Sequence, residues 1–188
     1  MGRGVWVWVF TTAWLVVTVA GFWRWERYDR IEGRVGEITA VPGEPTGSCR
    51  LRVFLHPHCP CSRATLHELT AITRATPALS IHVLFVRPNG TPDDWERGEL
   101  WDAANQIPGV EVASDPGGAA ARRFGAVTSG HAVLTDPTGR VAFRGGLTAA
   151  RGRTGGSIGR SAVTSWVSGN TGESAAPVFG CRLSASDE

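Results

Sequence analysis

The stretch His56-Pro57-His58-Cys59-Pro60-Cys61-Ser62 joins a predicted strand to a predicted helix. Before it, residues 49–55 (CRLRVFL) alternate polar and apolar side chains, which is the period of a strand. After it, residues 62–73 place apolar side chains on one face of a helix that Pro77 must end. The two cysteines are therefore expected in the turn at the N-terminus of a helix.

Cys59 and Cys61 occupy a position that favours the thiolate form of a cysteine. Free N–H groups and the macrodipole at a helix N-terminus stabilise negative charge and lower the pKa of a thiol there. His58 and His56, where protonated, would lower that pKa further. The thiolate is the form that attacks disulfides or binds soft metals, so this turn is the predicted site of chemistry. Two buried structural thiols are the weaker interpretation.

A disulfide between Cys59 and Cys61 requires a bent backbone. Extended residues i and i+2 lie about 6.6–7.2 Å apart, whereas the Cα atoms of a disulfide usually lie about 5.5–6 Å apart. Pro60 fixes one backbone dihedral between the two thiols. Such a ring would be tight and readily reduced.

The rest of the sequence from residue 74 alternates strands and helices. Strands are predicted at 79–86, 110–113, 131–135 and 141–144, and helices at 91–106, 117–124 and 160–167. Asp136-Pro137-Thr138-Gly139 has the residue types of a hairpin turn. This order predicts an α/β sandwich with a mixed sheet.

The N-terminal segment has a different composition. Residues 5–23 (VWVWVFTTAWLVVTVAGFW) carry no charge and have the length of about 20 residues that a membrane-spanning helix needs. Five of the eight Trp residues lie within the first 25 positions, and all but Trp14 of these lie near the ends of the run, like the aromatic belts of a spanning helix. A cleaved signal peptide has a shorter apolar region and a small-residue cleavage site, whereas this run closes on Phe22-Trp23-Arg24-Trp25. An uncleaved transmembrane anchor with its flanks is predicted over residues 1–32.

Composition divides the remaining chain into three parts. Residues 33–48 are punctuated by Gly and Pro and are interpreted as a flexible linker of about 20 Å. Residues 49–170 form the predicted domain, and residues 171–188 form a polar tail that carries Cys181. All 19 basic residues are Arg, against 17 acidic ones, and a net charge of +2 without basic runs argues against nucleic acid as a partner. The charges that flank the anchor leave its orientation open, because long domains translocate regardless of them.

The chain resembles the thioredoxin superfamily. The strand, the Cys-containing turn, the helix and the next strand are followed by Phe124-Gly125-Ala126-Val127, a strand, a hairpin and Gly145-Gly146. The insertion at 92–113 resembles membrane-anchored thiol–disulfide oxidoreductases of cytochrome maturation and peroxiredoxins. HPHCPCSRATLHEL, TSGHAVLTDPTGRVAFRGGLTAARG and the terminal VFGC resemble a bacterial group labelled RedB-like. The resemblance covers residues 49–181 and implies a thioredoxin-like three-layer fold with a mixed sheet, preceded by one N-terminal transmembrane helix. It also implies a bacterial cell membrane as the location, crossed once, with the soluble domain periplasmic or otherwise extracytoplasmic.

Two departures from the family pattern bear on function. The usual Cys-x-x-Cys reads Cys59-Pro60-Cys61-Ser62, so Ser62 stands where the resolving cysteine belongs, and Cys61 is expected to resolve instead. Gly130, after Ser129 in the expected active-site loop, stands where the family has a cis-proline. In the family that proline presents backbone to a bound disulfide and shields the thiols from metals.

Two functions are therefore predicted as alternatives. The first is a membrane-anchored thiol–disulfide oxidoreductase in which Cys59 attacks a protein thiol or disulfide partner and Cys61 resolves, with no cofactor required. The second is a metal-binding or metallochaperone module in which Cys59, Cys61 and His131 hold Cu(I) or Zn(II), the metals that suit soft thiolate and imidazole ligands. Peroxide reduction is a weaker third interpretation, because Cys59 lacks the Thr of the peroxidatic Thr-x-x-Cys.

Cys49 and Cys181 are left without a fixed partner by the sequence. Cys49 opens the first strand as either a small core residue or a redox partner. Cys181 follows Val178-Phe179-Gly180, an apolar anchor suited to docking that thiol on the domain. Cys181 either resolves a disulfide of Cys59 or Cys61 or pairs with Cys49, and four cysteines allow three pairings.

Overall fold

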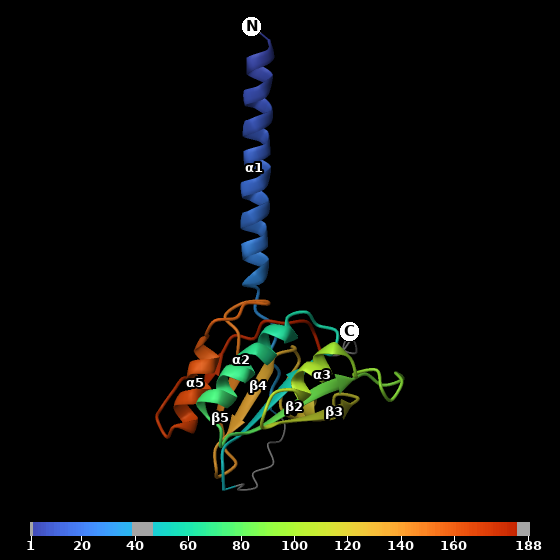
Figure 1. Ribbon diagram of the computed structural model, residues 1–188, viewed down its shortest axis with the longest axis vertical. Helices are drawn as coiled ribbons and strands as arrows, with labels where there is room; N and C mark the ends of the chain where they lie inside the picture. The colour runs from blue at the N-terminus through green and yellow to red at the C-terminus, as the bar shows by residue number, and fades with distance from the viewer. Residues whose placement is uncertain (1, 39–46, 184–188) are drawn as a thin grey trace. The chain divides into compact units, whose positions relative to one another are not determined.

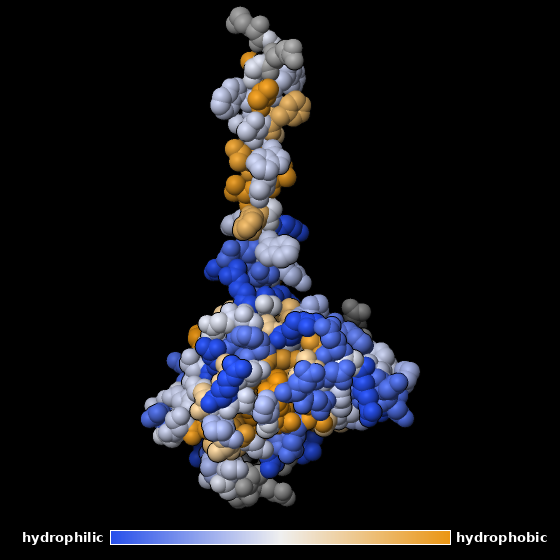
Figure 2. Space-filling model, viewed as in Figure 1, coloured by the Kyte–Doolittle hydropathy of each residue, from blue (hydrophilic) through white to orange (hydrophobic). Residues whose placement is uncertain are grey.

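The computed structural model describes residues 2–38 and 47–183, and the chain divides into two units, Met1–Ile31 and Glu32–Glu188. The first unit is helix α1 (Arg3–Asp29) (Figure 1). Its segment Gly4–Asp29 is long and apolar enough to cross a membrane, and none of its most apolar window is buried. Figure 2 shows apolar residues on the outside of this helix. The length and composition expected of a transmembrane helix are therefore present.

The second unit is built on a six-stranded mixed sheet in the order β3-β2-β1-β4-β5-β6. β1 pairs in parallel with β2 and β2 with β3, whereas β4 runs antiparallel to both β1 and β5. The strands are β1 (Arg50–Leu55), β2 (Ser80–Arg87), β3 (Val110–Pro116), β4 (His131–Thr135), β5 (Val141–Gly146) and β6 (Ala175–Ala176). The helices are α2 (Ser62–Ala75), α3 (Glu99–Asn105), α4 (Ala119–Arg123) and α5 (Ile158–Val167).

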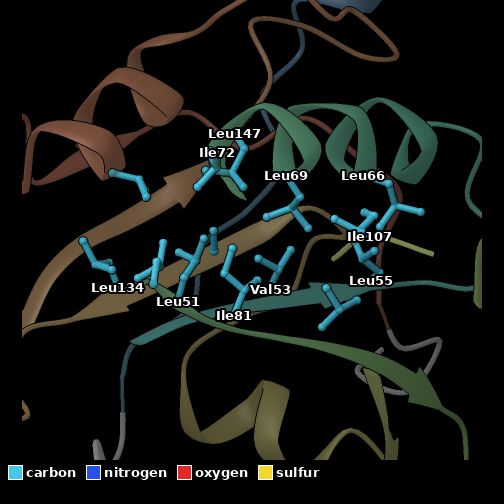
Figure 3. Close-up of a cluster of buried hydrophobic side chains, with 14 of the residues drawn as sticks. Leu51, Val53, Leu55, Leu66, Leu69, Ile72, Ile81, Ile107, Leu134 and Leu147 are labelled. Carbon is cyan, nitrogen blue, oxygen red and sulfur yellow. The ribbon is translucent and has the colours of Figure 1, made fainter. Parts of the chain in front are cut away.

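Alternation along β1 divides the apolar side chains between two clusters, one on each face of the sheet. Leu51, Val53 and Leu55 pack against residues of α2, α3 and α5, and Figure 3 shows Leu66, Leu69 and Ile72 of α2 over β1. We call this cluster the α2-side core. The second cluster, the α4-side core, consists of Phe54, Val86, Ala121, Phe124, Ala126, Val133 and Leu183. The predicted α/β sandwich with a mixed sheet is confirmed.

The helix predicted over residues 91–106 is shorter in the structure and begins only at Glu99. Residues before it form separate turns, with the Trp95 N–H donating to the Pro92 carbonyl and the Arg97 N–H to the Asp94 carbonyl. Gly98 then adopts a fully extended backbone, which interrupts any helix that these turns could start. This irregular segment places Trp95 and Glu96 beside the cysteine turn, as described below.

Residues 33–36, which belong to the predicted flexible linker, are hydrogen-bonded within the second unit. The Gly33 N–H donates to the Val178 carbonyl at 2.7 Å, and the Gly36 N–H donates to the Gly125 carbonyl at 2.8 Å. The Thr128 hydroxyl donates to the Arg34 carbonyl at 2.7 Å. The prediction of a free coil from residue 33 is therefore wrong for residues 33–36, because their backbone groups are hydrogen-bonded. Residues 39–46 of the predicted linker lie outside the described residues.

Candidate active site

The cysteine turn lies between the end of β1 and the start of α2, as predicted. The Cys59 N–H donates to the His56 carbonyl at 3.2 Å, and the Ser62 N–H donates to the Cys59 carbonyl at 3.0 Å. Pro60 lies between the two thiols and accepts the Arg63 N–H at its carbonyl, while Cys61 is the N-cap residue of α2. Cys59 is 1% exposed and Cys61 is half-buried.

The structure brings Cys59 together with Cys181. Their Sγ atoms lie 2.8 Å apart, although 122 positions separate the two residues in the sequence. Cys181 is exposed, and it is the thiol that lies against the buried Cys59. Cys49 lies immediately before β1, at the end of that strand opposite the cysteine turn, and packs against the α2-side core. The structure therefore places Cys181, and not Cys49, at the predicted site.

Hydrogen bonds stabilise the thiolate of Cys59. Burial raises the pKa of this thiol, but hydrogen bonds from the Cys181 thiol, from the N–H groups of Cys181 and Cys61 and from the Ser62 hydroxyl outweigh burial and leave the pKa below its ordinary value. Burial, followed by the hydrogen bond and the charge of Cys59, raises the pKa of Cys181 to about 12. Burial and the charge of Cys59 also raise the pKa of Cys61, while Arg151 lowers it. Of the three thiols, Cys59 is therefore the one whose surroundings favour the thiolate.

Ser62 and Ser129 connect the cysteine turn to the loop before β4. Their hydroxyl oxygens lie 2.9 Å apart, and both residues are buried. The His56 N–H donates to the Ser129 hydroxyl at 2.8 Å, and the Ser62 hydroxyl donates to the His56 carbonyl at 3.2 Å. Ser62, which stands where the family pattern has its second cysteine, thus holds the active-site loop against α2.

Gly130 follows Ser129 in a left-handed conformation, with φ of +90°. Its N–H donates to the Phe54 carbonyl at 2.8 Å, which fixes the loop to the end of β1. A Cβ at this position would lie 3.1 Å from the Thr65 hydroxyl, so glycine suits both the dihedral and the space. No cis peptide bond occurs within residues 2–38 and 47–183.

Residues 178–183, which we call the C-terminal strap, run antiparallel to residues 127–129. The Ser129 N–H donates to the Cys181 carbonyl at 2.8 Å, and the Leu183 N–H donates to the Val127 carbonyl at 3.0 Å. Thr128 and Arg182 form an antiparallel bridge between these two contacts. Arg151 donates from Nη1 to the Gly180 carbonyl at 2.6 Å. These contacts hold Cys181 over Cys59.

His56 and His58 pack around Trp95. The ring centroids of His58 and Trp95 lie 4.6 Å apart, and those of His56 and Trp95 lie 5.6 Å apart. Burial, and next the charge of His58, lowers the pKa of His56, whose Nδ1 accepts the His58 N–H at 3.1 Å. The lowered pKa of His56 disfavours its protonated form, which is the form that would lower the pKa of the cysteine thiols.

A cavity of about 340 Å³ opens beside Cys59 and is lined by His58, Arg63 and Glu96 among others. Glu96 is 2% exposed, and its Oε2 atom has no hydrogen-bond partner among the described residues. Arg63 forms an ion pair of 2.9 Å with Glu99 at this opening. Trp95 and Glu96 do not stand out in the sequence, because its pattern assigns both residues to a regular helix.

His131 lies apart from the two cysteines of the turn. It pairs with Phe54 across β1 and β4, so its side chain shares the sheet face of the α4-side core, whereas α2 covers the opposite face. It is fully buried, both ring nitrogens lack a partner among the described residues, and burial, followed by the charge of Arg144, lowers its pKa to about 4. The expected placement of His131 beside Cys59 and Cys61 is wrong, because the strand turns its side chain to the other face. Among residues 2–38 and 47–183, no group of three or more His, Cys, Asp or Glu side chains is arranged to hold a metal ion.

Three parallel strands, an antiparallel β4–β5 pair and a helix that starts at a cysteine turn define a thioredoxin-like fold. The predicted fold is confirmed, and the thiols of Cys59 and Cys181 lie against each other at the cysteine turn.

Comparison with solved structures finds two chains of similar fold and low sequence identity. An uncharacterized conserved protein from Geobacillus kaustophilus is similar with a TM-score of 0.63 and 16% identity, over 82% of this chain and 94% of that one. A hypothetical protein from Sinorhizobium meliloti 1021 is similar with a TM-score of 0.61 and 17% identity, over 81% of this chain and 95% of the other. The pneumococcal exposed lipoprotein thioredoxin Etrx1 from Streptococcus pneumoniae gives a TM-score of 0.48 and 14% identity, over 72% of this chain and 99% of that chain. No family model and no curated protein matches the sequence.

Proposed function

We propose that the chain is a membrane-anchored thiol–disulfide oxidoreductase in which Cys59 is the attacking thiolate. The observation that carries the proposal is the 2.8 Å separation of the Cys59 and Cys181 sulfur atoms at the start of α2. Hydrogen bonds that lower the pKa of Cys59 support its role as the nucleophile, because only the thiolate attacks a disulfide. The reaction uses thiols alone and requires no cofactor.

Cys181, rather than Cys61, is the resolving thiol in this proposal. The Cys59 thiolate attacks the disulfide of a protein partner, which forms a mixed disulfide and releases the first partner thiolate to take up a proton. Cys181 then loses its proton and attacks Cys59 Sγ. The mixed disulfide breaks, and the second partner thiolate leaves and is protonated. The partner gains two electrons, and Cys59 and Cys181 are left joined as a disulfide.

The resolving role of Cys61 that the sequence predicted receives less support from the geometry. Cys61 is the N-cap residue of α2, where its thiol interacts with Arg151 as well as with Cys59. The strap, by contrast, places the Cys181 sulfur directly against Cys59.

The anchor in this proposal is α1, and the second unit lies outside the cytoplasm. The exposed apolar surface of α1 supports membrane insertion, since about 20 apolar residues span the hydrocarbon core. An oxidising compartment would allow a Cys59–Cys181 disulfide to persist. Alkaline phosphatase fused after the last residue should be active in whole cells, and a phosphatase that is inactive there would contradict this orientation.

Trapping with single-cysteine variants tests the reaction. Cys181→Ser should accumulate a protein partner disulfide-linked to Cys59, because the mixed disulfide can no longer be resolved. Cys61→Ser should behave as the unaltered chain does, and Cys49→Ser is the matched control outside the site. The absence of any adduct at Cys59, over a range of redox buffers, would contradict the proposed function.

A further inference from the structure

Arg151, in the loop between β5 and α5, interacts with both the C-terminal strap and the cysteine turn. Its Nη1 donates to the carbonyl of Gly180, the residue before Cys181, at 2.6 Å. The same guanidinium interacts with the Cys61 thiol, and its charge acts on Cys61 and Cys181 alike. One cation therefore contacts the segment that carries the proposed resolving thiol and the turn that carries the nucleophile.

The loop that carries Arg151 is fixed by its own packing. Leu147 is fully buried in the α2-side core, and Ala150 is 5% exposed. The Ser157 hydroxyl donates to the Leu147 carbonyl at 2.7 Å. Arg151 itself is half-buried. Because its loop is packed in this way, the guanidinium is in position before any partner binds.

Cys59 controls the protonation of Cys181 in the reduced site. Burial, followed by the hydrogen bond and the charge of Cys59 and then by the charge of Cys61, raises the pKa of Cys181 to about 12, while Arg151 lowers it. A thiol with this pKa is protonated at neutral pH and does not attack a disulfide. Resolution therefore requires a change at Cys59.

Formation of the mixed disulfide supplies that change. When the Cys59 sulfur is bonded to the partner sulfur it carries no negative charge, so the hydrogen bond and the charge of Cys59 no longer raise the pKa of Cys181. The positive charge of Arg151, which acts in the opposite direction, remains. The Cys181 thiolate is therefore more favourable after the partner is bound than before.

We propose that Arg151 is the positioning residue of the resolving step. Its guanidinium holds the strap by the Gly180 carbonyl and stabilises the Cys181 thiolate that attacks Cys59 in the mixed disulfide. This inference rests on the proposed function and adds to it the residue that controls when the partner is released.

The resolving step balances in protons and electrons. Cys181 gives its proton to water, and its thiolate, beside the guanidinium, attacks Cys59 Sγ. The Cys59–Cys181 bond forms and the bond to the partner breaks. The partner thiolate leaves with the electron pair of that bond and takes up a proton. Arg151 exchanges no proton, because a guanidinium stays charged throughout.

Other charged groups near Cys181 come from the strap itself and from the segment after α1. Arg182 is exposed, and alternation along the strap turns its side chain away from that of Cys181. Arg34 and Glu32 line a cavity of about 540 Å³ beside the strap, and their opposite charges offset each other. Residues 127–129, which pair with the strap, carry no titratable side chain. The guanidinium of the β5–α5 loop is therefore the cation expected to act on the thiolate.

Reaction of the full-length chain in detergent with bis-thionitrobenzoate disulfide separates attack from resolution. Cys49→Ser and Cys61→Ser leave Cys59 and Cys181 as the two thiols of this parent chain. Attack by Cys59 releases one thionitrobenzoate at a rate proportional to the probe concentration. Resolution by Cys181 releases the second at a rate independent of that concentration. The second phase therefore reports the resolving step alone.

Arg151→Gln in this parent should slow the second phase about tenfold at neutral pH, because loss of a neighbouring opposite charge raises the pKa of a thiol. The plateau of the second phase at alkaline pH should change less than about twofold, since Cys181 is a thiolate there with or without the cation. Arg151→Lys, which keeps the charge, should retain the pH profile of the parent. A purely structural role would instead lower the plateau and leave the pH dependence unchanged.

Arg182→Gln is the matched control, because it removes the same charge from the exposed side of the strap. It should change the second phase less than about twofold. Identical pH profiles in Arg151→Gln and the parent would overturn the inference, and so would an equal shift in Arg182→Gln or a profile in Arg151→Lys like that of Arg151→Gln.

The two phases separate this inference from the proposed function. A first phase of normal rate, followed by a second phase that does not depend on Arg151, would leave Cys59 as the nucleophile and contradict the role of Arg151. Release of only one thionitrobenzoate by the parent would contradict Cys181 as the resolving thiol and the inference with it. Absence of a first phase from Cys59 would instead contradict the proposed oxidoreductase function.

Discussion

The donors around the Cys59 sulfur set the pKa of that thiol. Burial opposes ionisation, and the Cys181 thiol is the first of the hydrogen bonds that outweigh burial. Cys181→Ala should therefore raise the pKa of Cys59, although the backbone N–H donors remain. Thiolate ultraviolet absorbance of the reduced protein as a function of pH measures this pKa. Cys49→Ala should leave it unchanged, and an equal or lower pKa in Cys181→Ala would contradict the assignment of the donors.

The lowered pKa of Cys59 also affects stability. The folded pKa lies below the unfolded one, so the stability that the thiolate contributes is complete above the unfolded pKa. This contribution is lost as the pH falls through the folded pKa.

Ser62 marks the difference between this chain and the usual two-cysteine motif. Its hydroxyl interacts with Cys59, so a thiol at this position would lie near the Cys59 sulfur in the first turn of α2. The double variant Cys61→Ser, Cys181→Ser should lose turnover in insulin disulfide reduction. Addition of Ser62→Cys should restore insulin disulfide reduction, since two thiols three positions apart at a helix start form a disulfide readily. Failure of the added thiol to form a disulfide with Cys59 would contradict the placement of Ser62.

The sequence predicted the cysteine turn well because local patterns determine it. Alternation in residues 49–55 and the apolar spacing in residues 62–73 place the thiols at a helix start. The position of His131 could not be predicted, because the face on which its side chain lies depends on the register between β1 and β4. The choice of Cys181 as the neighbour of Cys59 also depends on backbone pairing far away in the sequence.

At the scale of elements, a buried ion pair connects α2 to α5. Arg160 Nη1 lies 2.8 Å from Glu68 Oε2, and the Gly155 N–H donates to Glu68 Oε1 at 2.8 Å. Glu68 is fully buried, so Arg160→Ala leaves a buried carboxylate without its cation and should destabilise the second unit by about 3 kcal/mol. Chemical denaturation measures the loss.

Arg63→Ala is the control for this loss, because the ion pair of Arg63 with Glu99 is exposed on both sides. It should cost less than about 1 kcal/mol. Equal losses of stability in Arg160→Ala and Arg63→Ala would show that burial of Glu68 does not cause the larger loss expected for Arg160→Ala.

Short elements explain most of what the sequence did not predict about the fold. β6 has two residues and is held by pairing with Arg144 and Gly145 of β5, which leaves no periodic pattern in the sequence. α3 starts late because Gly98 interrupts the segment before it. The longer elements β1, β2 and α2 have clear periodicity, and their predicted positions agree with the structure to within two residues at each end.

At the scale of the whole molecule, the boundary between the units lies at Ile31 and Glu32, not at the end of the predicted linker. A chain that begins at Glu32 should fold and keep the Cys59–Cys181 couple. A chain that begins at Cys49 loses the hydrogen bonds of residues 33–36 with Gly125, Thr128 and Val178. At roughly 1 kcal/mol for each lost bond, it should be about 3 kcal/mol less stable in urea. Equal stability of the two chains would contradict the bound state of residues 33–36.

Disulfide mapping of the oxidised full-length chain tests whether Cys59 pairs with Cys181. Trypsin should release residues 53–63, which contain Cys59 and Cys61, and residues 161–182, which contain Cys181. Mild oxidation should join these two peptides, and they should remain joined in Cys61→Ser but not in Cys59→Ser. A disulfide closed within residues 53–63, with Cys181 still free, would contradict this pairing.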